Sequence, residues 1–128
     1  MVAENFTITN TTKSTLPRVP FALIKEKALG KKYSLSLVFV GEKQSQNINN
    51  TYRGKNNPTN ILSFEYDKNE GEIFICLAKA KQDAKKFDRE FDNFIAFLFI
   101  HGLVHLKGME HGSRMERAET ALRKKFGV

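Results

Sequence analysis

The three histidines of this sequence all lie near the C-terminus, at spacings that suit metal binding. His101 and His105 are four residues apart, so on a helix their imidazoles project from one face, one turn apart. Gly108 follows and can adopt the positive φ that ends a helix, which lets the chain turn back and bring His111 towards the other two. Three neutral imidazoles around one tetrahedral ion leave a fourth position for water. This spacing predicts a catalytic metal centre rather than a closed structural one.

The histidine motif matches the metzincin pattern H-E-x-x-H-x-x-G-x-x-H at all three histidines and at the glycine. It departs at one place, since Gly102 stands where the glutamate general base would be. Two other interpretations stay open: three unrelated histidines that are solvated or hydrogen-bonded, and a structural zinc site without chemistry. The structural site is disfavoured because Cys76, the only cysteine and the usual kind of structural ligand, is far away in sequence.

Length and charge set broad bounds on the class of protein. A chain of 128 residues is large enough for one compact domain with a single core, which we expect to span residues 1–128. Its 21 basic and 14 acidic residues give a net charge of +7. Such an excess favours a polyanionic partner, most obviously RNA, and a lysine-rich surface that only keeps the protein in solution is the alternative.

Three features of the chain bear on its location. The single cysteine permits no internal disulfide, which fits a reducing compartment. Residues 1–15 are polar and contain no apolar core of a signal peptide. The longest apolar stretch, at residues 94–100, is too short to span a bilayer. We therefore expect a cytoplasmic protein that makes no membrane contact.

Hydrophobic periodicity and turn residues predict the elements that position the motif. The expected strands are 5–9 at a sheet edge, 32–40, 60–66, and 72–77 as the antiparallel partner of 60–66. The expected helices are 21–29 (ended by Gly30), 42–52, 78–87, one from a cap at Asp92 or Asn93 to Leu106, and one begun by a capping box at Ser113.

This order of elements predicts an α+β fold, with helices packed on a small mixed β-sheet. Strand 72–77 is apolar on both faces, which predicts a buried strand covered by helices. The helix that ends at Leu106 is apolar nearly all round, so we expect it to be the buried central helix. It carries His101 and His105 in its last two turns, where desolvation favours the neutral imidazoles that metals bind.

Three other residues have side chains that suit phosphate chemistry. Arg53 lies in the predicted loop 53–59, where its guanidinium would bind phosphate oxygens in a geometry that lysine cannot copy. Ser63, on the strand 60–66, would line the site with its hydroxyl, and Glu110, next to His111, would orient a ligand or act as a base. The alternatives are an exposed loop arginine, a structural serine and a solvated turn residue.

Segments 49–64, 71–76 and 101–111 together resemble the YbeY family of bacterial single-strand-specific endoribonucleases, also called rRNA maturation factors. The resemblance covers about residues 35–126, and the family pattern H-G-x-x-H-L-x-G-x-D-H includes the glycine at position 102. Two residues depart from that pattern: Glu110 and Glu72 each replace the usual aspartate. Both changes keep the charge and lengthen the side chain.

The resemblance implies a zincin-like metal-dependent hydrolase fold and one Zn²⁺ per chain on His101, His105 and His111. It also implies that Arg53 is the functional arginine and that Ser63 lines the cleft. The implied activity is hydrolysis of single-stranded RNA in rRNA maturation and ribosome quality control, with ribosomal-subunit proteins as further candidate partners. The sequence leaves the oligomeric state open, and a monomer is expected.

Two rival functions stay open beside this one. A small metalloprotease would use the same metal on a peptide, but Gly102 in place of the glutamate and the basic composition argue against it. A non-enzymatic RNA- or ribosome-binding module would use the metal only to fasten the end of the helix. Cleavage of single-stranded RNA that is lost in His105→Ala, without loss of RNA binding, separates the three functions.

Overall fold

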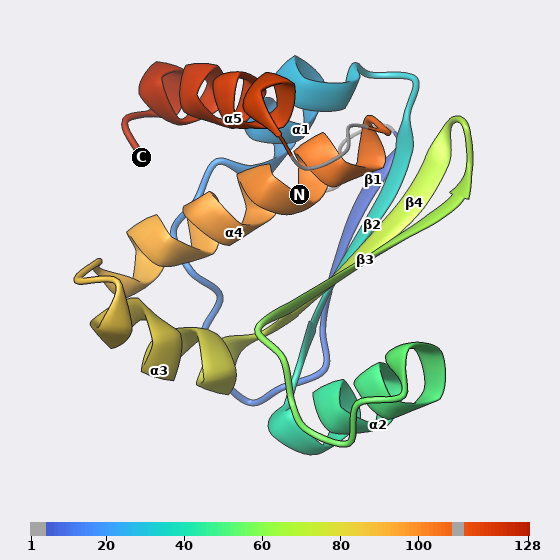
Figure 1. The fold of residues 1–128 in the computed structure, drawn as a ribbon, viewed down its shortest axis with the longest axis vertical. Coiled ribbons are helices and arrows are strands. Elements are labelled where there is room, and N and C mark those ends of the chain that lie inside the picture. The colour runs from blue at the N-terminus through green and yellow to red at the C-terminus, as the bar shows by residue number, and fades with distance from the viewer. Residues whose placement is uncertain (1–4, 109–111) are drawn as a thin grey trace.

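A computed structural model of the protein describes residues 5–108 and 112–128. Within these residues the elements follow one another in the order β1-α1-β2-α2-β3-β4-α3-α4-α5 (Figure 1). The strands are β1 (Phe6–Asn10), β2 (Ser34–Val40), β3 (Ile61–Asp67) and β4 (Glu70–Cys76). The helices are α1 (Phe21–Leu29), α2 (Glu42–Arg53), α3 (Leu77–Lys86), α4 (Phe91–Leu106) and α5 (Ser113–Phe126).

The strands form one mixed sheet in the order β1-β2-β4-β3. β1 pairs parallel with β2, β2 pairs parallel with β4, and β3 pairs antiparallel with β4. The predicted antiparallel hairpin is confirmed, and so is the position of β1 at an edge. β3 lies at the other edge, so one side of that strand is open to the site described below.

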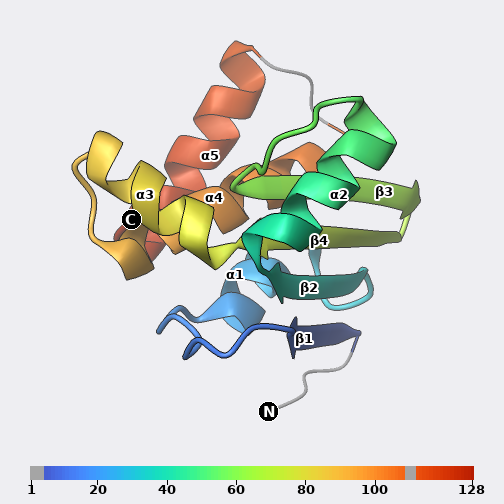
Figure 2. The same ribbon diagram turned by 90° about the horizontal axis from the view of Figure 1, so that it is seen from below.

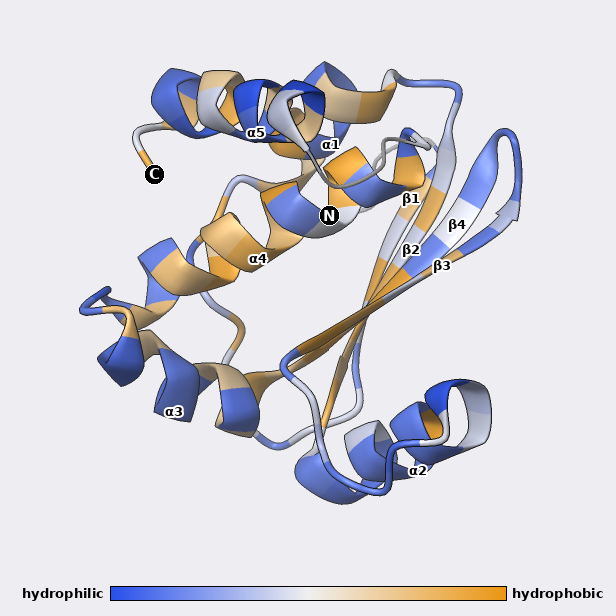
Figure 3. Ribbon diagram, viewed as in Figure 1, coloured by the Kyte–Doolittle hydropathy of each residue, from blue (hydrophilic) through white to orange (hydrophobic). Residues whose placement is uncertain are grey.

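One face of the sheet, called the inner face here, is covered by α4 and α1, and α5 packs on these two helices (Figure 1). The odd-numbered residues of β2 and β4 point to this face, and Leu37, Ile73 and Ile75 are fully buried there. Helix α4 packs across them and buries Ile95 and Leu103 completely. Burying each such side chain stabilises the fold by about 1.5–3 kcal/mol. The expected central helix is therefore confirmed, and Figure 3 shows its apolar character along most of its length.

Among the described helices, α2 alone covers the opposite, outer face of the sheet, and it does so at one end (Figures 1 and 2). A small second cluster lies there, formed by Val38, Val40 and Cys76 with the half-buried Phe74 packed against it. Further along β4, Glu72 is only half-buried. The expectation that helices cover both faces of β4 is therefore right near Cys76 and wrong towards Glu72, because α2 is too short to reach that far.

Several element ends differ from the sequence-based expectation. Arg53 is the last residue of α2 and not the first of a loop, because the left-handed turn that ends the helix is made by Gly54 at φ 68°. Leu77 begins α3 instead of continuing the apolar face of β4. Helix α4 begins at Phe91 with Glu90 as its N-cap, so neither Asp92 nor Asn93 caps it. Phe91 packs against the core, and this tertiary contact extends the helix past the polar residues.

The start of α5 also differs from the prediction. The N-cap is Gly112 at φ 151°, a backbone conformation that essentially only glycine adopts, so Ser113 is the first helical residue and no capping box forms there. The apolar residues of this helix face the core, since Met115 is buried and Ala118, Leu122 and Phe126 pack against the core cluster. None of the helices in the described residues is long and apolar enough to cross a membrane.

Candidate active site

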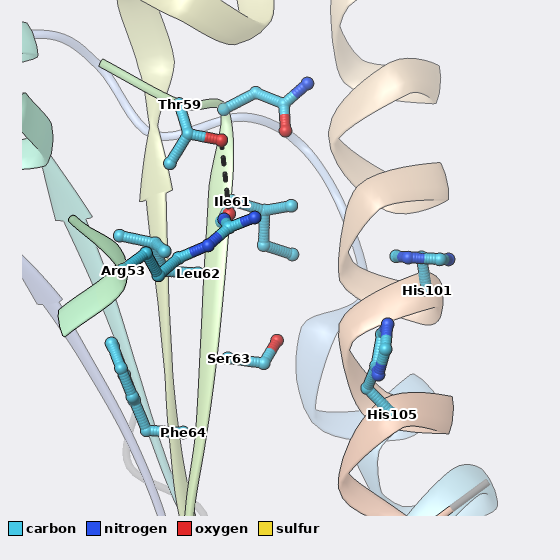
Figure 4. Close-up of a pocket in the computed structure, with 9 residues that line it drawn as sticks. Arg53, Thr59, Ile61, Leu62, Ser63, Phe64, His101 and His105 are labelled. Carbon is cyan, nitrogen blue, oxygen red and sulfur yellow. Dashed lines mark hydrogen bonds between the residues drawn. The ribbon is translucent and has the colours of Figure 1, made fainter. Parts of the chain in front are cut away.

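A cavity of about 450 Å³ opens between α4 and the edge strand β3. Four residues predicted to form the site lie around it: Arg53, Ser63, His101 and His105 (Figure 4). They come from α2, β3 and α4, which are separated in sequence and brought together by the sheet. The other lining residues are Thr59, Asn60, Ile61, Leu62 and Phe64.

The α4 wall of the cavity carries the two histidines. Their four-residue spacing places both rings on one side of the helix, with ring centroids 4.9 Å apart and planes at 83°. Both histidines are half-buried, whereas Leu103 and Val104, between them in sequence, are fully buried on the other side of the helix. The imidazoles are therefore presented by a helix whose position the core fixes.

Glu119 of α5 contacts the first of these histidines. Its Oε1 lies 2.6 Å from Nδ1 of His101, and only 15% of its side chain is exposed. When Nδ1–H donates to the carboxylate, the lone pair of the ring is on Nε2, the tautomer that binds a metal through that nitrogen. Glu119 is not among the residues predicted from the sequence. The one signal that could have found it is its place as an acidic residue within the apolar stripe of α5, four residues after Met115.

Gly102 lies at a close approach of α4 to the sheet. A Cβ atom at this position would lie 2.9 Å from Oγ of Ser63, 3.0 Å from Cδ1 of Ile61 and 3.1 Å from Cδ1 of Ile73. The glutamate of the metzincin pattern would therefore have to enter the packed interface between helix and sheet. Glycine at this position leaves room for these three side chains, and the same packing places Ser63 beside α4.

The opposite wall contains Arg53, at the end of α2, and the loop that leads from α2 into β3. The loop after Gly54 is tied to the buried polar face of α2: Oγ of Ser45 donates to the Thr59 carbonyl (2.8 Å) and accepts from the Thr59 N–H (3.0 Å). Asn49 Nδ2 donates to the Asn57 carbonyl at 2.8 Å. These bonds fix the course of the chain from the end of α2 into β3, and hence the position of Arg53 relative to the strand.

The far end of this loop is fixed as well. Asn60 donates to the carboxylate of Asp83 on α3 at 2.9 Å, and its carbonyl accepts from the N–H of Cys76 at 3.0 Å. Asp83 also pairs with Lys79 at 3.4 Å and Lys86 at 3.8 Å. The loop that leads into β3 is thus fixed by hydrogen bonds at both of its ends, and β3 continues from it along the cavity.

Some predicted site residues cannot be placed in this way. His111 and Glu110 lie outside the described residues. Among the residues that the structure does describe, no group of three His, Cys, Asp or Glu side chains is arranged to hold a metal ion. Cys76 is buried on the outer face of the sheet, and burial raises the pKa of its thiol, so it is a poor candidate ligand.

The second departure from the family pattern, Glu72, lies away from the cavity. Its carboxylate accepts hydrogen bonds from Ser36 Oγ, at 3.1 Å, and from the hydroxyl of Tyr66. The bond to Glu72 raises the pKa of Tyr66 to about 12. Glu72 therefore lies with its partners on the outer face of the sheet, and it is not among the residues that line the cavity.

A sequence model of the family described as "Endoribonuclease YbeY" matches residues 3–126 of the chain. The chain belongs to the endoribonuclease YbeY family. The resemblance inferred from the sequence motifs is thereby confirmed. Endoribonuclease YbeY proteins are hydrolases of the zincin-like fold, and the α+β architecture with a small mixed sheet agrees with that class.

Individual relatives extend over most of the chain. The chain is 38% identical over 105 residues to endoribonuclease YbeY of Aster yellows witches'-broom phytoplasma, covering 75% of this chain and 68% of the relative. It is 40% identical over 101 residues to that of Pseudoalteromonas translucida, covering 71% and 66%. It is 32% identical over 124 residues to that of Francisella philomiragia, covering 84% and 78%.

A solved structure supports the fold alone. The solution structure of a Thermotoga maritima protein superposes with a TM-score of 0.70 at 22% identity, covering 95% of this chain and 89% of that one. The arrangement of β3 against α4 therefore belongs to a fold that has been observed experimentally.

Proposed function

We propose that this protein is a metal-dependent endoribonuclease that hydrolyses phosphodiester bonds in single-stranded RNA. The observation that carries the proposal is the cavity in which Arg53 lies across from His101 and His105, in a chain of the endoribonuclease YbeY family. The excess of seven positive charges supports a polyanionic substrate.

The proposed metal ligands are His101, His105 and His111, with one Zn²⁺ per chain. The described residues fit this role: two imidazoles one helical turn apart share a cavity wall, and Glu119 orients one of them. The third ligand follows from the spacing of His111 after Gly108. When bound by three imidazoles, zinc lowers the pKa of a water molecule towards neutrality and polarises a phosphoryl oxygen.

Arg53 binds the phosphodiester from the opposite wall in this proposal. Its guanidinium donates to the phosphoryl oxygens and stabilises the charge that grows on them in the transition state. The Ser63 hydroxyl, at the close approach of β3 and α4, supplies a further donor into the cavity. Glu110 is proposed to orient His111 or to accept a proton from water, as its place next to that histidine indicates.

The biological part of the proposal is maturation of ribosomal RNA in the cytoplasm, with ribosomal-subunit proteins as candidate partners of a monomer. The single cysteine of the chain, Cys76, is buried and free of any disulfide, which supports an intracellular role. Comparison of ribosomal RNA ends in cells with and without the gene tests this part separately from the chemistry.

The test of the chemistry is single-turnover cleavage of a single-stranded RNA by zinc-loaded protein at saturating concentration. We expect no cleavage by His105→Ala, and a roughly 10- to 1,000-fold slower rate for Arg53→Ala with unchanged zinc content. Arg53→Lys recovers only part of that rate, because a point charge cannot replace a bidentate fork.

The matched control is Lys81→Ala, which removes an exposed positive charge on α3. It leaves the single-turnover rate at saturation unchanged and lowers only the salt-dependent affinity. If Arg53→Ala cleaves RNA at the wild-type rate, the arginine has no catalytic role. RNA binding without cleavage by zinc-loaded wild type supports the non-enzymatic module instead.

A further inference from the structure

Three aromatic side chains form a row that begins at the cavity and continues over the outer face of the sheet. The ring of Tyr52 lies 5.1 Å from that of Phe64, at an interplanar angle of 60°. Phe64 lies 5.8 Å from Phe74, edge to face at 77°. We call Tyr52 and Phe64, backed by Phe74, the aromatic platform.

The platform follows from the fold. Phe64 and Phe74 are on neighbouring strands, where Leu62 pairs with Phe74, so the two rings are diagonal neighbours on the outer face. Tyr52 is the penultimate residue of α2, and the helix ends at Arg53. Since α2 covers only one end of this face, 68% of Tyr52 is exposed. A large aromatic ring is thus held on a backing of other rings while much of its surface faces solvent.

The platform is continuous with the proposed catalytic cavity. Phe64 lines that cavity together with Arg53 and His101, because the cavity extends around the open edge of β3. Arg53 follows Tyr52 directly in the chain, and the exposed Lys55 follows two residues later. An anionic backbone held at Arg53 therefore has an exposed aromatic surface beside it and a second cation nearby.

We propose that the aromatic platform binds an unpaired nucleobase of the nucleotide that flanks the phosphate held at Arg53. This inference rests on the proposed endoribonuclease function, and it specifies how the RNA substrate is bound. Aromatic side chains stack on any base, because every base has a π-face, and the stack needs a base that is not already covered by neighbours in a duplex. The platform would therefore select single strands without selecting sequence.

Base binding at the platform can be followed by tryptophan fluorescence, because the protein contains no tryptophan of its own. Tyr52→Trp introduces a single indole at the platform, in a His105→Ala background that prevents cleavage in every arm. The probes are a single-stranded RNA and an abasic ribose-phosphate oligomer of the same length. The RNA changes the indole emission, whereas the abasic oligomer, which carries only the charge, leaves it unchanged.

Binding constants from labelled RNA give the size of the effect. Tyr52→Ala weakens RNA binding roughly 5- to 150-fold and leaves binding of the abasic oligomer unchanged. Tyr52→Phe keeps the ring and the affinity, which separates stacking from any use of the hydroxyl. The control is Phe87→Ala, which removes a ring that is 60% exposed and stacked on Phe94 on the α3–α4 side of the molecule.

Two results overturn the platform: an equal effect of Tyr52→Ala and Phe87→Ala, or an equal loss of affinity for RNA and abasic oligomer. Failure of the endoribonuclease proposal appears differently, as zinc-loaded wild type that does not cleave RNA. Cleavage by wild type together with base-independent binding refutes the platform alone, and base-dependent binding without cleavage refutes the enzyme alone.

Discussion

The two walls of the cavity are held in place by different forces. The wall formed by α4 is positioned by burial, since residues such as Ile95, Phe99 and Leu103 are fully removed from water. The wall formed by α2 and the loop into β3 is positioned by directional bonds from Ser45 and Asn49, each contributing about 0.5–1.5 kcal/mol net. The histidines are therefore placed by the core, and Arg53 is placed by a polar network.

This difference indicates how each wall should respond to substitution. Changes in the packed wall act first on the free energy of unfolding, because they disturb dense apolar packing. Changes in the polar wall act first on activity, because they release a segment that carries a functional group without opening the core. Substitutions at Gly102, Glu119 and Ser45 test this contrast, from the largest expected effect to the smallest, and Cys76, outside both walls, gives a smaller effect still.

The largest effect is expected at Gly102, in the packed wall. Gly102→Glu, which restores the metzincin glutamate, forces a carboxylate between α4 and β3 and lowers the free energy of unfolding by about 3 kcal/mol or more. Gly102→Ala has a smaller effect of about 1 kcal/mol, since its higher helix propensity offsets part of the crowding. Urea denaturation of both variants measures the difference, and a fully stable Gly102→Glu would contradict the close approach.

The second effect concerns the support of His101. Glu119→Gln keeps the size of the side chain and removes the carboxylate that accepts from Nδ1, so we expect zinc to bind about 10- to 100-fold more weakly. Competition with a chelator of known affinity measures this constant. Glu116→Gln, an exposed change in the first turn of the same helix, is the control and should leave zinc affinity unchanged. Equal affinities of the two variants would remove the orienting role.

The third effect lies in the polar wall. Ser45→Ala removes both hydrogen bonds to Thr59 and lowers the free energy of unfolding by about 1–2 kcal/mol. Single-turnover cleavage should fall in this variant although it remains folded, because the segment next to Arg53 loses its anchor. Ser36→Ala removes a hydroxyl bonded to Glu72, away from the cavity, and should leave the rate unchanged. A rate loss shared by both variants would argue against a specific anchor.

The smallest effect is expected at Cys76. Burial raises the pKa of this thiol, so its contribution to stability is fully present below the unfolded thiol pKa of about 8.5 and is lost as pH rises through the higher folded pKa. The stability difference between wild type and Cys76→Ala, measured by urea unfolding at pH 7 and pH 10, should therefore shift slightly against wild type at the higher pH. A shift in the opposite direction would mean that the thiolate is stabilised in the fold.

The sequence predicted the parts of the fold that depend on local pattern. The bounds of α1 at Phe21 and Leu29 agree with the structure, because the apolar stripe and Gly30 define both the helix and its end. The ends that were wrong depend on tertiary contacts or on one backbone angle: Phe91 joins α4 by packing on the core, and Gly112 replaces Ser113 as the cap of α5. Neither the start of α4 nor the cap of α5 can be predicted from hydrophobic periodicity.

The candidate site divides in the same way. Helical spacing alone placed His101 and His105 side by side, whereas Arg53 and Ser63 drew on the resemblance, because nothing local to them indicates that α2 and β3 meet α4. Glu119 was missed because its role depends on how α5 crosses α4, a long-range contact that one sequence does not specify. His111 and Glu110 remain predictions from spacing and family pattern.

The parallel pairing of the central strands has a consequence for how the chain folds. Ser36 of β2 meets its neighbour Glu72 on β4 at a separation of 36 positions, and only after that pairing does the apolar α4 acquire a complete surface to cover. Loop-closure entropy must be overcome before these contacts stabilise the chain, which makes such non-local sheets slow to form. During synthesis, β1 and β2 are therefore made well before β4, the second partner of β2, and α4, the most apolar helix, follows β4 after only one intervening helix.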